Sequence, residues 1–288
     1  MPPQSTRTNA QSPSASSNLQ QQSIYIIRHG DRWDYQHPEW KETAARKGDP
    51  SLSSLGHEQA RQAGRFLDQL FVQEGIDADQ ITLLSSPFLR TIQTSNEILA
   101  EMKLTKCKKN YCSAADSIKI QPESSIFELD LWGQGLHSSL PHMNERQCYF
   151  PRIDGDYQTM FVPSLPEDKD KFFGRCDSAM EHIARNFPCD NEKHPAIIVV
   201  THAACCIGLV KSAADVELED INPAHPCSIY RLRRTTNDNS WSVDHYSKKE
   251  GMNGYTGHMK DIGTCTRPWN NFGDRDTDNG YTGPPNQD

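Results

Sequence analysis

The sequence predicts an α/β protein, a three-layer sandwich in which helices flank a mostly parallel central sheet. Three short apolar runs, at 23–28, 81–85 and 196–200, have the length and composition of buried strands. Each run is followed, directly or after a loop, by a stretch whose apolar residues recur at helical spacing. Strands that alternate with helices are typical of parallel sheets, because neighbouring parallel strands need a crossover between them.

The elements of the first half can be placed in order. After the first strand comes a long polar connection and then a helix over 54–72, with its apolar residues on one face. Ser86 has the side chain of an N-cap and Pro87 suits a first helical position, which predicts a second long helix beginning there. Residues 105–117 are expected to be a loop insertion before a short strand near 118–121.

The second half begins with an irregular segment. Residues 132–170 show no clear period and contain many Gly, Pro and His residues, as expected for a functional cap rather than an ordinary connector. A helix is expected over 172–187, and another after the third strand, ending near residue 214. Two alternating runs, 228–233 and 240–246, predict a C-terminal hairpin.

The two ends of the chain differ in composition from the middle. Residues 1–22 are rich in Gln and Ser, and residues 249–288 are rich in Gly, Asp and Asn. Neither composition buries enough apolar surface to offset the entropy of ordering, so both are expected to be disordered or mostly irregular tails. Trp269 and Phe272 are apolar residues that could pack part of the second tail against the body. One folded domain is therefore predicted over 23–248.

Composition also narrows the classes of function. The chain has 288 residues and a net charge of −8, and it contains no Lys/Arg run, so nucleic acid is not an expected partner. No stretch approaches the ~20 apolar residues of a membrane span, and no signal-peptide pattern is visible. Its nine cysteines form no CxxC pair and are expected to be reduced thiols. The expected compartment is the cytoplasm, with the nucleus as the alternative.

Chemically capable residues follow each of the three predicted strands. The first ends in Arg28-His29-Gly30, the second is followed by Ser86 and Arg90, and the third ends in Thr201-His202. Each alone has an ordinary explanation, such as a surface arginine or a hydrogen-bonded core histidine. Because the carboxyl ends of parallel strands lie on one rim, where α/β sheets bind ligands, we expect these residues to converge. Imidazole can act as a nucleophile and guanidinium fits phosphate oxygens, so the set indicates phosphoryl chemistry.

With these residues in view, the chain resembles the histidine phosphatase superfamily, in the branch that includes phosphoglycerate mutase. The motifs that carry the resemblance run in order through most of the predicted domain, over residues 23–210. They are Arg28-His29-Gly30, Leu52-x-x-x-Gly56-x-x-Gln59-Ala60, Ser85-Ser86-Pro87-x-x-Arg90-x-x-x-Thr94, Glu128 and Val200-Thr201-His202. Mutases tend to carry Glu and then Ser or Gln after Arg-His-Gly, whereas this chain has Asp31-Arg32. That feature looks more like the phosphatase domains of the suppressor-of-T-cell-signalling proteins and of ecdysteroid-phosphate phosphatase.

The resemblance implies a role for each matching residue. Neutral His29 would attack phosphorus and form a phosphohistidine. Arg28, Arg90 and His202 would hold the non-bridging oxygens. Arg32 would bind phosphate as well, the ordinary alternative being an exposed loop arginine. Because positioning and charge stabilisation dominate phosphoryl transfer, such a pocket implies no metal and no other cofactor.

The reaction also needs a carboxyl group that protonates the leaving oxygen and then activates water. Glu128 matches the mid-chain glutamate of the mutase-like branch. Asp130 is its local rival, and Asp31 is a weaker one. The phytase-like branch uses an aspartate directly after the second histidine, but Ala203 stands there in this chain.

The expected function is a metal-independent phosphatase that hydrolyses phosphomonoesters, with a phosphorylated small molecule or a phosphopeptide as its partner. Aromatic residues of the cap could line a pocket for phosphotyrosine or a bulky apolar alcohol, or they could simply form the core of the cap. These residues are Trp132, Tyr149, Phe150, Tyr157 and Phe161, with Trp33 or Tyr35 approaching from the first loop. Two alternatives remain open: a catalytically weak or inactive interaction module, and a phosphoglycerate mutase or sugar-bisphosphate phosphatase. A homo-oligomer is compatible with all of them.

Overall fold

A six-stranded sheet in the order β3-β2-β4-β1-β5-β6 forms the centre of the protein. The computed structural model describes residues 21–104, 117–130, 140–189, 195–235, 240–244, 251–262 and 269. The strands are β1 (Gln21–Arg28), β2 (Ile81–Ser85), β3 (Ile120–Pro122), β4 (Ala196–Thr201), β5 (Ile229–Thr235) and β6 (Ser242–Val243). The first four of these pair in parallel, and β5 and β6 form an antiparallel edge. The predicted α/β sandwich with a mostly parallel sheet is therefore confirmed.

The register of the parallel strands brings three polar strand ends to one rim. Arg28 of β1 lies opposite Thr201 of β4, and Val200 of β4 lies opposite Ser85 of β2. The strands reach that rim as uninterrupted buried segments, so the residues that follow them start from fixed positions. At the other end, β1 begins at Gln21, two residues before the predicted strand, because Gln21 and Gln22 pair with β5. The buried Gln22 side chain also bonds Phe187 O (3.0 Å) and Arg234 Nε (2.7 Å).

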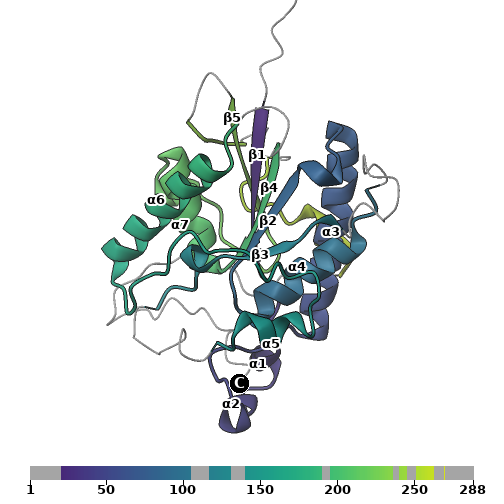
Figure 1. Cartoon of the computed structure of the whole chain (residues 1–288), viewed down its shortest axis with the longest axis vertical. Helices are drawn as coiled ribbons and strands as arrows, with labels where there is room; N and C mark the ends of the chain where they lie inside the picture. Colours follow the sequence, from purple (N-terminus) through teal and green to yellow (C-terminus); the bar gives the residue numbers. More distant parts are fainter. Residues whose placement is uncertain are drawn as a thin grey trace, which may run out of the picture.

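Two pairs of helices cover the two faces of the sheet (Figure 1). Helices α3 (Ser54–Glu74) and α4 (Leu89–Glu101) pack on one face, and α6 (Lys169–Asn186) and α7 (Ala203–Ala214) pack on the other. The apolar side chains of each pair form a separate core with the facing side of the strands. The three layers predicted from the alternation of strands and helices are thus present. No helix within the described parts of the chain is both long and apolar enough to cross a membrane.

Helix α4 begins later than the sequence pattern predicts. We expected Ser86 to be its N-cap, but the N-cap is Phe88. The Ser86 hydroxyl contacts His202 Nε2 at 2.8 Å instead, and its amide donates to Val200 O at 2.9 Å. The first helical amide, Leu89 N, is satisfied by the Asp49 carboxylate at 2.7 Å. The local capping preference of serine is therefore overridden by contacts between residues far apart in sequence.

Short elements lie beyond the carboxyl ends of the parallel strands, at the bottom of Figure 1. They are α1 (Trp33–Gln36), α2 (Trp40–Thr43) and α5 (Met143–Gln147), the last of which belongs to the predicted cap. The remaining elements are the 3₁₀ helices η1 (Ala78–Gln80), η3 (Ser124–Ile126), η5 (Leu218–Asp220) and η6 (Gly257–Ile262). Buried Glu123 ties the cap to the sheet, because its carboxylate accepts from Tyr157 Oη, Thr159 Oγ1 and Met160 N.

The turn after β1 is held by an unusually close approach to α3. A Cβ added to Gly30 would lie 2.4 Å from Gly56 O, and a Cβ added to Gly56 would lie 2.1 Å from Asp31 O. Both positions therefore require glycine, because any side chain would force two backbone segments apart. This contact fixes the position of His29, which lies between β1 and Gly30.

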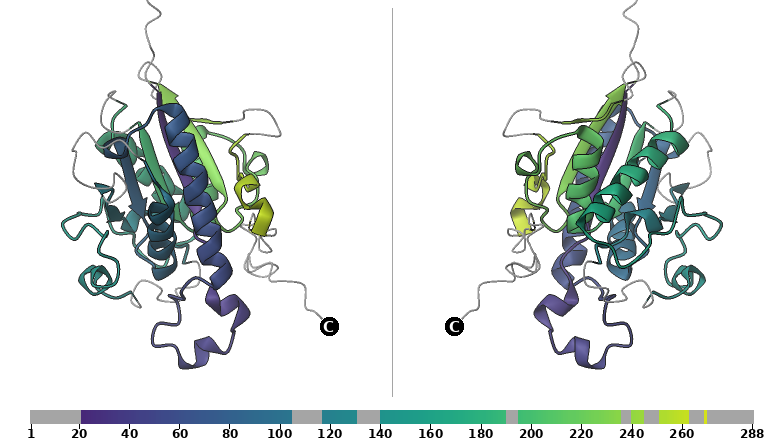
Figure 2. Two further views of the ribbon diagram at one scale, coloured as in Figure 1. Left: turned by 90° about the vertical axis from the view of Figure 1, so that its right-hand side faces the viewer. Right: turned by 90° about the vertical axis from the view of Figure 1, so that its left-hand side faces the viewer.

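Part of the C-terminal segment packs along β5. Tyr255 forms two backbone hydrogen bonds with Ile229, and Arg231 N donates to Met252 O at 2.7 Å. The 3₁₀ helix η6 follows and lies beside α3, as the left view of Figure 2 shows. Residues 251–262 are thus an ordered part of the body, although the composition of 249–288 predicted a mostly irregular tail.

Candidate active site

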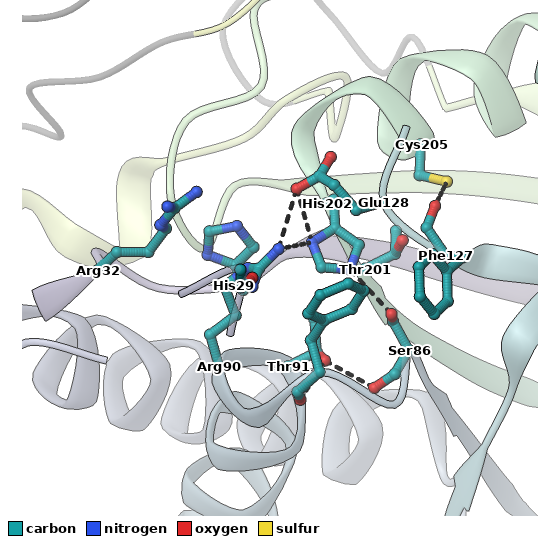
Figure 3. A network of polar contacts seen from close by, with 12 residues as sticks. His29, Arg32, Ser86, Arg90, Thr91, Phe127, Glu128, Thr201, His202 and Cys205 are labelled. Atoms are coloured by element: carbon teal, nitrogen blue, oxygen red, sulfur yellow. Dashed lines mark hydrogen bonds and ion pairs between the residues drawn. The ribbon is translucent and has the colours of Figure 1, made fainter. Parts of the chain in front are cut away.

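Five side chains that are far apart in the sequence or come from different elements meet at the carboxyl rim of the sheet (Figure 3). They are His29 after β1, Arg32 before α1, Arg90 in the first turn of α4, Glu128 after η3, and His202 at the N-cap of α7. The convergence expected from the strand ends therefore occurs, and Glu128 joins it from a loop.

His29 is buried, with a relative exposure of 2%, and its ring is oriented by its own turn. Nδ1 lies 2.7 Å from Gly30 O. Because a carbonyl oxygen only accepts, Nδ1 carries the proton and Nε2 keeps its lone pair. Burial, together with the charges of Arg90 and Arg28, holds the pKa of His29 well below its usual value of 6.5. At neutral pH this imidazole is uncharged and can act as a nucleophile.

Arg90 links the other members of the site. Its Nη2 donates to Glu128 Oε2 at 3.1 Å and lies 3.2 Å from His202 Nδ1. Its Nη1 donates to Gly48 O at 3.3 Å, and its guanidinium lies over the Phe88 ring, 4.3 Å from the centroid. These contacts hold a buried cation in one orientation, with its fork toward the site.

His202 is fully buried and has a partner at each ring nitrogen. Nε2 contacts Ser86 Oγ at 2.8 Å, and Nδ1 lies 3.1 Å from Glu128 Oε2. Burial lowers the pKa of His202 to about 4, although the Glu128 carboxylate favours the protonated ring. The ring stacks edge-on against His29 with centroids 5.4 Å apart.

Glu128 carries an ionised carboxylate. Burial alone would raise its pKa, but the adjacent His202 and Arg90 outweigh burial and hold the pKa well below its usual value. Of the two rival carboxyl groups, Asp31 is used to hold the turn, because its Oδ2 accepts from Ser53 Oγ at 2.7 Å. Asp130 is buried two residues after Glu128. The carboxyl group that contacts both Arg90 and His202 is Glu128.

Arg28 precedes His29 in the sequence and Arg32 follows it, and the two guanidinium groups are held by different partners. Arg28 is buried, and its Nη1 donates to Ala224 O at 2.7 Å. Arg32 makes a bidentate pair with Asp34, with Nε–Oδ1 at 2.9 Å and Nη2–Oδ2 at 2.7 Å. The Arg32 guanidinium also lies over the Tyr35 ring, 4.6 Å from its centroid.

Two motif residues that the sequence marked without a role hold the turn that carries His29. Gly30 N donates to Thr94 Oγ1 at 3.1 Å, and Asp31 N donates to Gln59 Oε1 at 2.8 Å. Sequence reasoning missed Asp34, which orients Arg32, and Asp49, which caps α4 beside Arg90. Both are acidic residues in a polar loop, and nothing in the local pattern distinguishes them from solvated charges.

Three of the site residues also have the composition of a metal site. His29, Glu128 and His202 each offer a ligand atom, and these atoms lie within 4.8 Å of one another. However, the charges of Arg90 and Arg32 act on the same groups. Two guanidinium cations beside the trio oppose the binding of a further cation and favour an anion such as phosphate.

The aromatic residues proposed for the leaving-group pocket have different positions. Phe150 packs against the core under α3 and α4, whereas Tyr157 and Phe161 pack against the core under α6 and α7. Tyr149 is exposed, and Trp132 lies outside the described residues. In the first loop, Trp33 stacks on His37 with centroids 3.9 Å apart. Most cap aromatics therefore anchor the cap.

A parallel α/β sheet with a neutral histidine, several fixed guanidinium groups and a carboxylate at its carboxyl rim is the arrangement expected of a phosphatase or phosphomutase. Residues 24–110 match the model of the histidine phosphatase superfamily, branch 1. This match bears out the resemblance to the histidine phosphatase superfamily that the motifs indicate.

Two curated proteins are similar in sequence to this chain. The chain is 28% identical over 233 residues to the human ubiquitin-associated and SH3 domain-containing protein A, covering 70% of this chain and 32% of that protein. It is 31% identical over 153 residues to the protein of that name from Mus musculus, covering 50% of this chain and 21% of the relative. The chain thus spans a third or less of these relatives.

A solved structure supports the fold. The ecdysone phosphate phosphatase of Bombix mori, in complex with tungstate, superposes with a TM-score of 0.55 at 20% identity. The match covers 77% of this chain and 91% of that one.

Proposed function

We propose that the protein is a metal-independent phosphatase that hydrolyses phosphomonoesters through a phosphohistidine on His29. The observation that carries the proposal is the protonation state of the His29 ring. Its Nδ1 proton is engaged by Gly30 O at 2.7 Å, and its burial among cations keeps it uncharged at neutral pH. Nε2 therefore has a lone pair available beside groups that attract a phosphoryl anion.

Arg28, Arg32 and Arg90 supply the charge that binds the phosphoryl group. Each guanidinium is held by the protein before substrate arrives: Arg28 by a carbonyl, Arg32 by Asp34, and Arg90 by Gly48 O and the Phe88 ring. Donors that are already oriented need no reorganisation when charge develops on the transferring group. Planar guanidinium forks also match pairs of phosphate oxygens.

In the first step, His29 Nε2 forms a bond to phosphorus while the bond from phosphorus to the leaving oxygen breaks. The leaving oxygen takes a proton from Glu128. This carboxyl is ionised beside Arg90 and His202, but a bound phosphate dianion neutralises the charge of Arg90 and adds negative charge nearby. Both effects raise the pKa of Glu128 and allow it to carry the proton that the leaving oxygen needs.

In the second step, Glu128 takes a proton from water as the water oxygen attacks phosphorus. The bond between phosphorus and His29 Nε2 breaks, inorganic phosphate forms, and Glu128 is again protonated. His202 Nδ1 lies beside Glu128 Oε2 and Arg90 Nη2, so it can donate to Glu128 or to a phosphoryl oxygen bound by Arg90.

The substrate class is a phosphomonoester with an aryl or bulky apolar leaving group, such as a phosphorylated small molecule or a phosphotyrosine peptide. The solved relative named above is a phosphatase for ecdysone phosphate. In this chain Tyr35 lies against Arg32, and Trp33 is 37% exposed in the same loop. These aromatic surfaces next to a phosphate-binding arginine favour an apolar leaving group over a small sugar phosphate.

The test is phosphate release from an aryl phosphate in the presence of a chelator, comparing the intact protein with His29→Ala. Activity that survives chelation and disappears in the variant, together with acid-labile label on the intact protein from a phosphorus-labelled substrate, supports the proposal. Chelator-sensitive activity, or activity retained by His29→Ala, contradicts it. Inactivity of the folded protein on a panel of aryl, sugar and peptide phosphates would favour an interaction module. Transfer to an acceptor rather than to water would favour a mutase.

A further inference from the structure

Among the described residues of the C-terminal segment, Trp269 is linked through Ala224 to an arginine of the site. It pairs with Ala224 in an isolated antiparallel bridge: Ala224 N donates to Trp269 O at 2.8 Å, and Trp269 N donates to Ala224 O at 3.1 Å. The same Ala224 oxygen accepts from Arg28 Nη1 at 2.7 Å. One fully buried carbonyl group therefore joins the C-terminal segment to an arginine of the site.

The loop that carries Ala224 also holds the end of β1. Cys227 N donates to Arg28 O at 3.0 Å and lies 3.4 Å from His29 O. Arg28 N in turn donates to Ser228 O at 3.4 Å. Cys227 adopts a left-handed conformation, with φ of 54°, which a non-glycine residue keeps only where its surroundings hold it. The position of this loop thus affects both Arg28 and the backbone of His29.

Residues from the C-terminal segment hold this loop at Asn222 and at Ala224, among other points. Asn222 Nδ2 donates to Asn253 O at 2.6 Å, and Asn222 N donates to Asn253 Oδ1 at 3.2 Å. Trp269 forms the second point, and its side chain packs against the hydrophobic core under α6 and α7. Of the two contacts, the one through Trp269 is made at the residue that binds Arg28.

We propose that Trp269 is a positioning residue for oxyanion binding, which acts by fixing Ala224 O and thereby the guanidinium of Arg28. The inference rests on the proposed role of Arg28 as a phosphate ligand. A free arginine side chain has many rotamers, so a carbonyl that selects one of them lowers the entropic cost of binding phosphate. When Trp269 does not dock, the loop loses two backbone hydrogen bonds and this selection weakens.

The test uses the full chain and orthovanadate as the probe. Trp269→Ala is expected to weaken vanadate binding about tenfold, measured by calorimetry, since a hydrogen bond to a charged group is lost or loosened. For an aryl phosphate, KM should rise more than kcat falls. Trp269→Phe, which keeps an aromatic anchor, should restore most of the affinity. Trp269→Leu replaces the alanine variant if thermal unfolding shows that the latter does not fold.

Trp241→Ala is the matched control. Trp241 belongs to the same hydrophobic core, but it stacks on Arg234, 4.5 Å from the ring centroid. Arg234 pairs with Gln22 at the amino end of β1, far from the site. The control should lower thermal stability and leave the vanadate affinity unchanged. An equal loss of affinity in the two tryptophan variants would overturn the inference, because the effect would then follow stability alone.

A double-mutant cycle with Arg28→Ala decides whether Trp269 acts through Arg28. If it does, Trp269→Ala has no further effect on vanadate affinity once Arg28 is removed. Additive losses, or an unchanged affinity in Trp269→Ala alone, contradict the inference. Vanadate binding does not require turnover, so a protein that binds vanadate but hydrolyses no ester would refute the proposed function and still test this inference.

Discussion

Asp34 sets the orientation of Arg32, and its replacement tests whether that orientation matters for catalysis. Both oxygens of Asp34 accept from Arg32, at 2.9 Å and 2.7 Å, and the Asp34 side chain is only 1% exposed. The Arg32 side chain is 19% exposed and leans on the Tyr35 ring. The two bonds from Nε and Nη2 to Asp34 fix the plane of the Arg32 guanidinium.

The change Asp34→Asn keeps the shape of the side chain but removes its charge. One side-chain oxygen still accepts a hydrogen bond from Arg32. The amide nitrogen that replaces the other oxygen is itself a donor, so it cannot accept the second hydrogen bond from Arg32. A hydrogen bond to a charged group contributes about 1.5–3 kcal/mol. Because Arg32 is partly exposed, we take the low end of this range, and about 1.4 kcal/mol corresponds to about a tenfold loss in kcat/KM.

The assay is steady-state hydrolysis of an aryl phosphate by folded Asp34→Asn, with Glu39→Gln as the control. Glu39 lies in the same loop and makes an exposed pair with His37, so its loss should change kcat/KM by less than twofold. The loss in Asp34→Asn should appear mainly in KM, because Arg32 binds the phosphoryl group in both ground and transition states. A kcat/KM within twofold of the parent value would refute the reasoning, since Arg32 would then need no anchor or bind no phosphate.

Three further predictions follow from the site. Glu128→Gln should slow esters with poor leaving groups far more than nitrophenyl esters, which need no acid, and an equal loss on both would argue against the acid role. Burial and the neighbouring arginines keep the pKa of His29 well below 6.5, so kcat/KM should stay constant between about pH 7.5 and about pH 6.5; a titration centred near 6.5 would contradict this. Arg146→Met removes the cation that pairs with buried Asp49, which should lower the free energy of unfolding by about 3–5 kcal/mol in a denaturant titration. A change under 1 kcal/mol would show that the cap is not held by this pair.

The sequence was sufficient for the sheet and for the main helices, because their signals are periodic and local. The apolar runs of β1, β2 and β4 are buried along their whole length, and the helices that follow carry their apolar residues on one side. The polar strand ends converge as the parallel topology predicts. The roles of the residues at these strand ends are predicted from the order of the motifs along the chain, because no single residue is specific enough.

What the sequence could not predict depends on contacts between distant segments. Ser86 has the local signature of a cap, but a histidine 116 residues away takes its hydroxyl group. Glu123 looks like an ordinary surface charge until the cap residues Tyr157, Thr159 and Met160 fold back onto it. The packing of Trp269 was expected in outline, yet its partner Ala224 carries no sequence signal at all.

The glycine pair at the turn after β1 has a consequence for variation among proteins of this design. Each of Gly30 and Gly56 excludes a side chain because the backbone of the other segment already occupies that volume. Neither residue offers a functional group, yet a saturation-mutagenesis library selected for phosphatase activity should be as depleted at these two positions as at His29. No second change at the partner glycine can relieve the clash, because glycine is already the smallest residue. The charges at the rim and the residues of the cap can therefore vary during evolution. This turn cannot, because no substitution at Gly30 or Gly56 is accommodated by a change at the other.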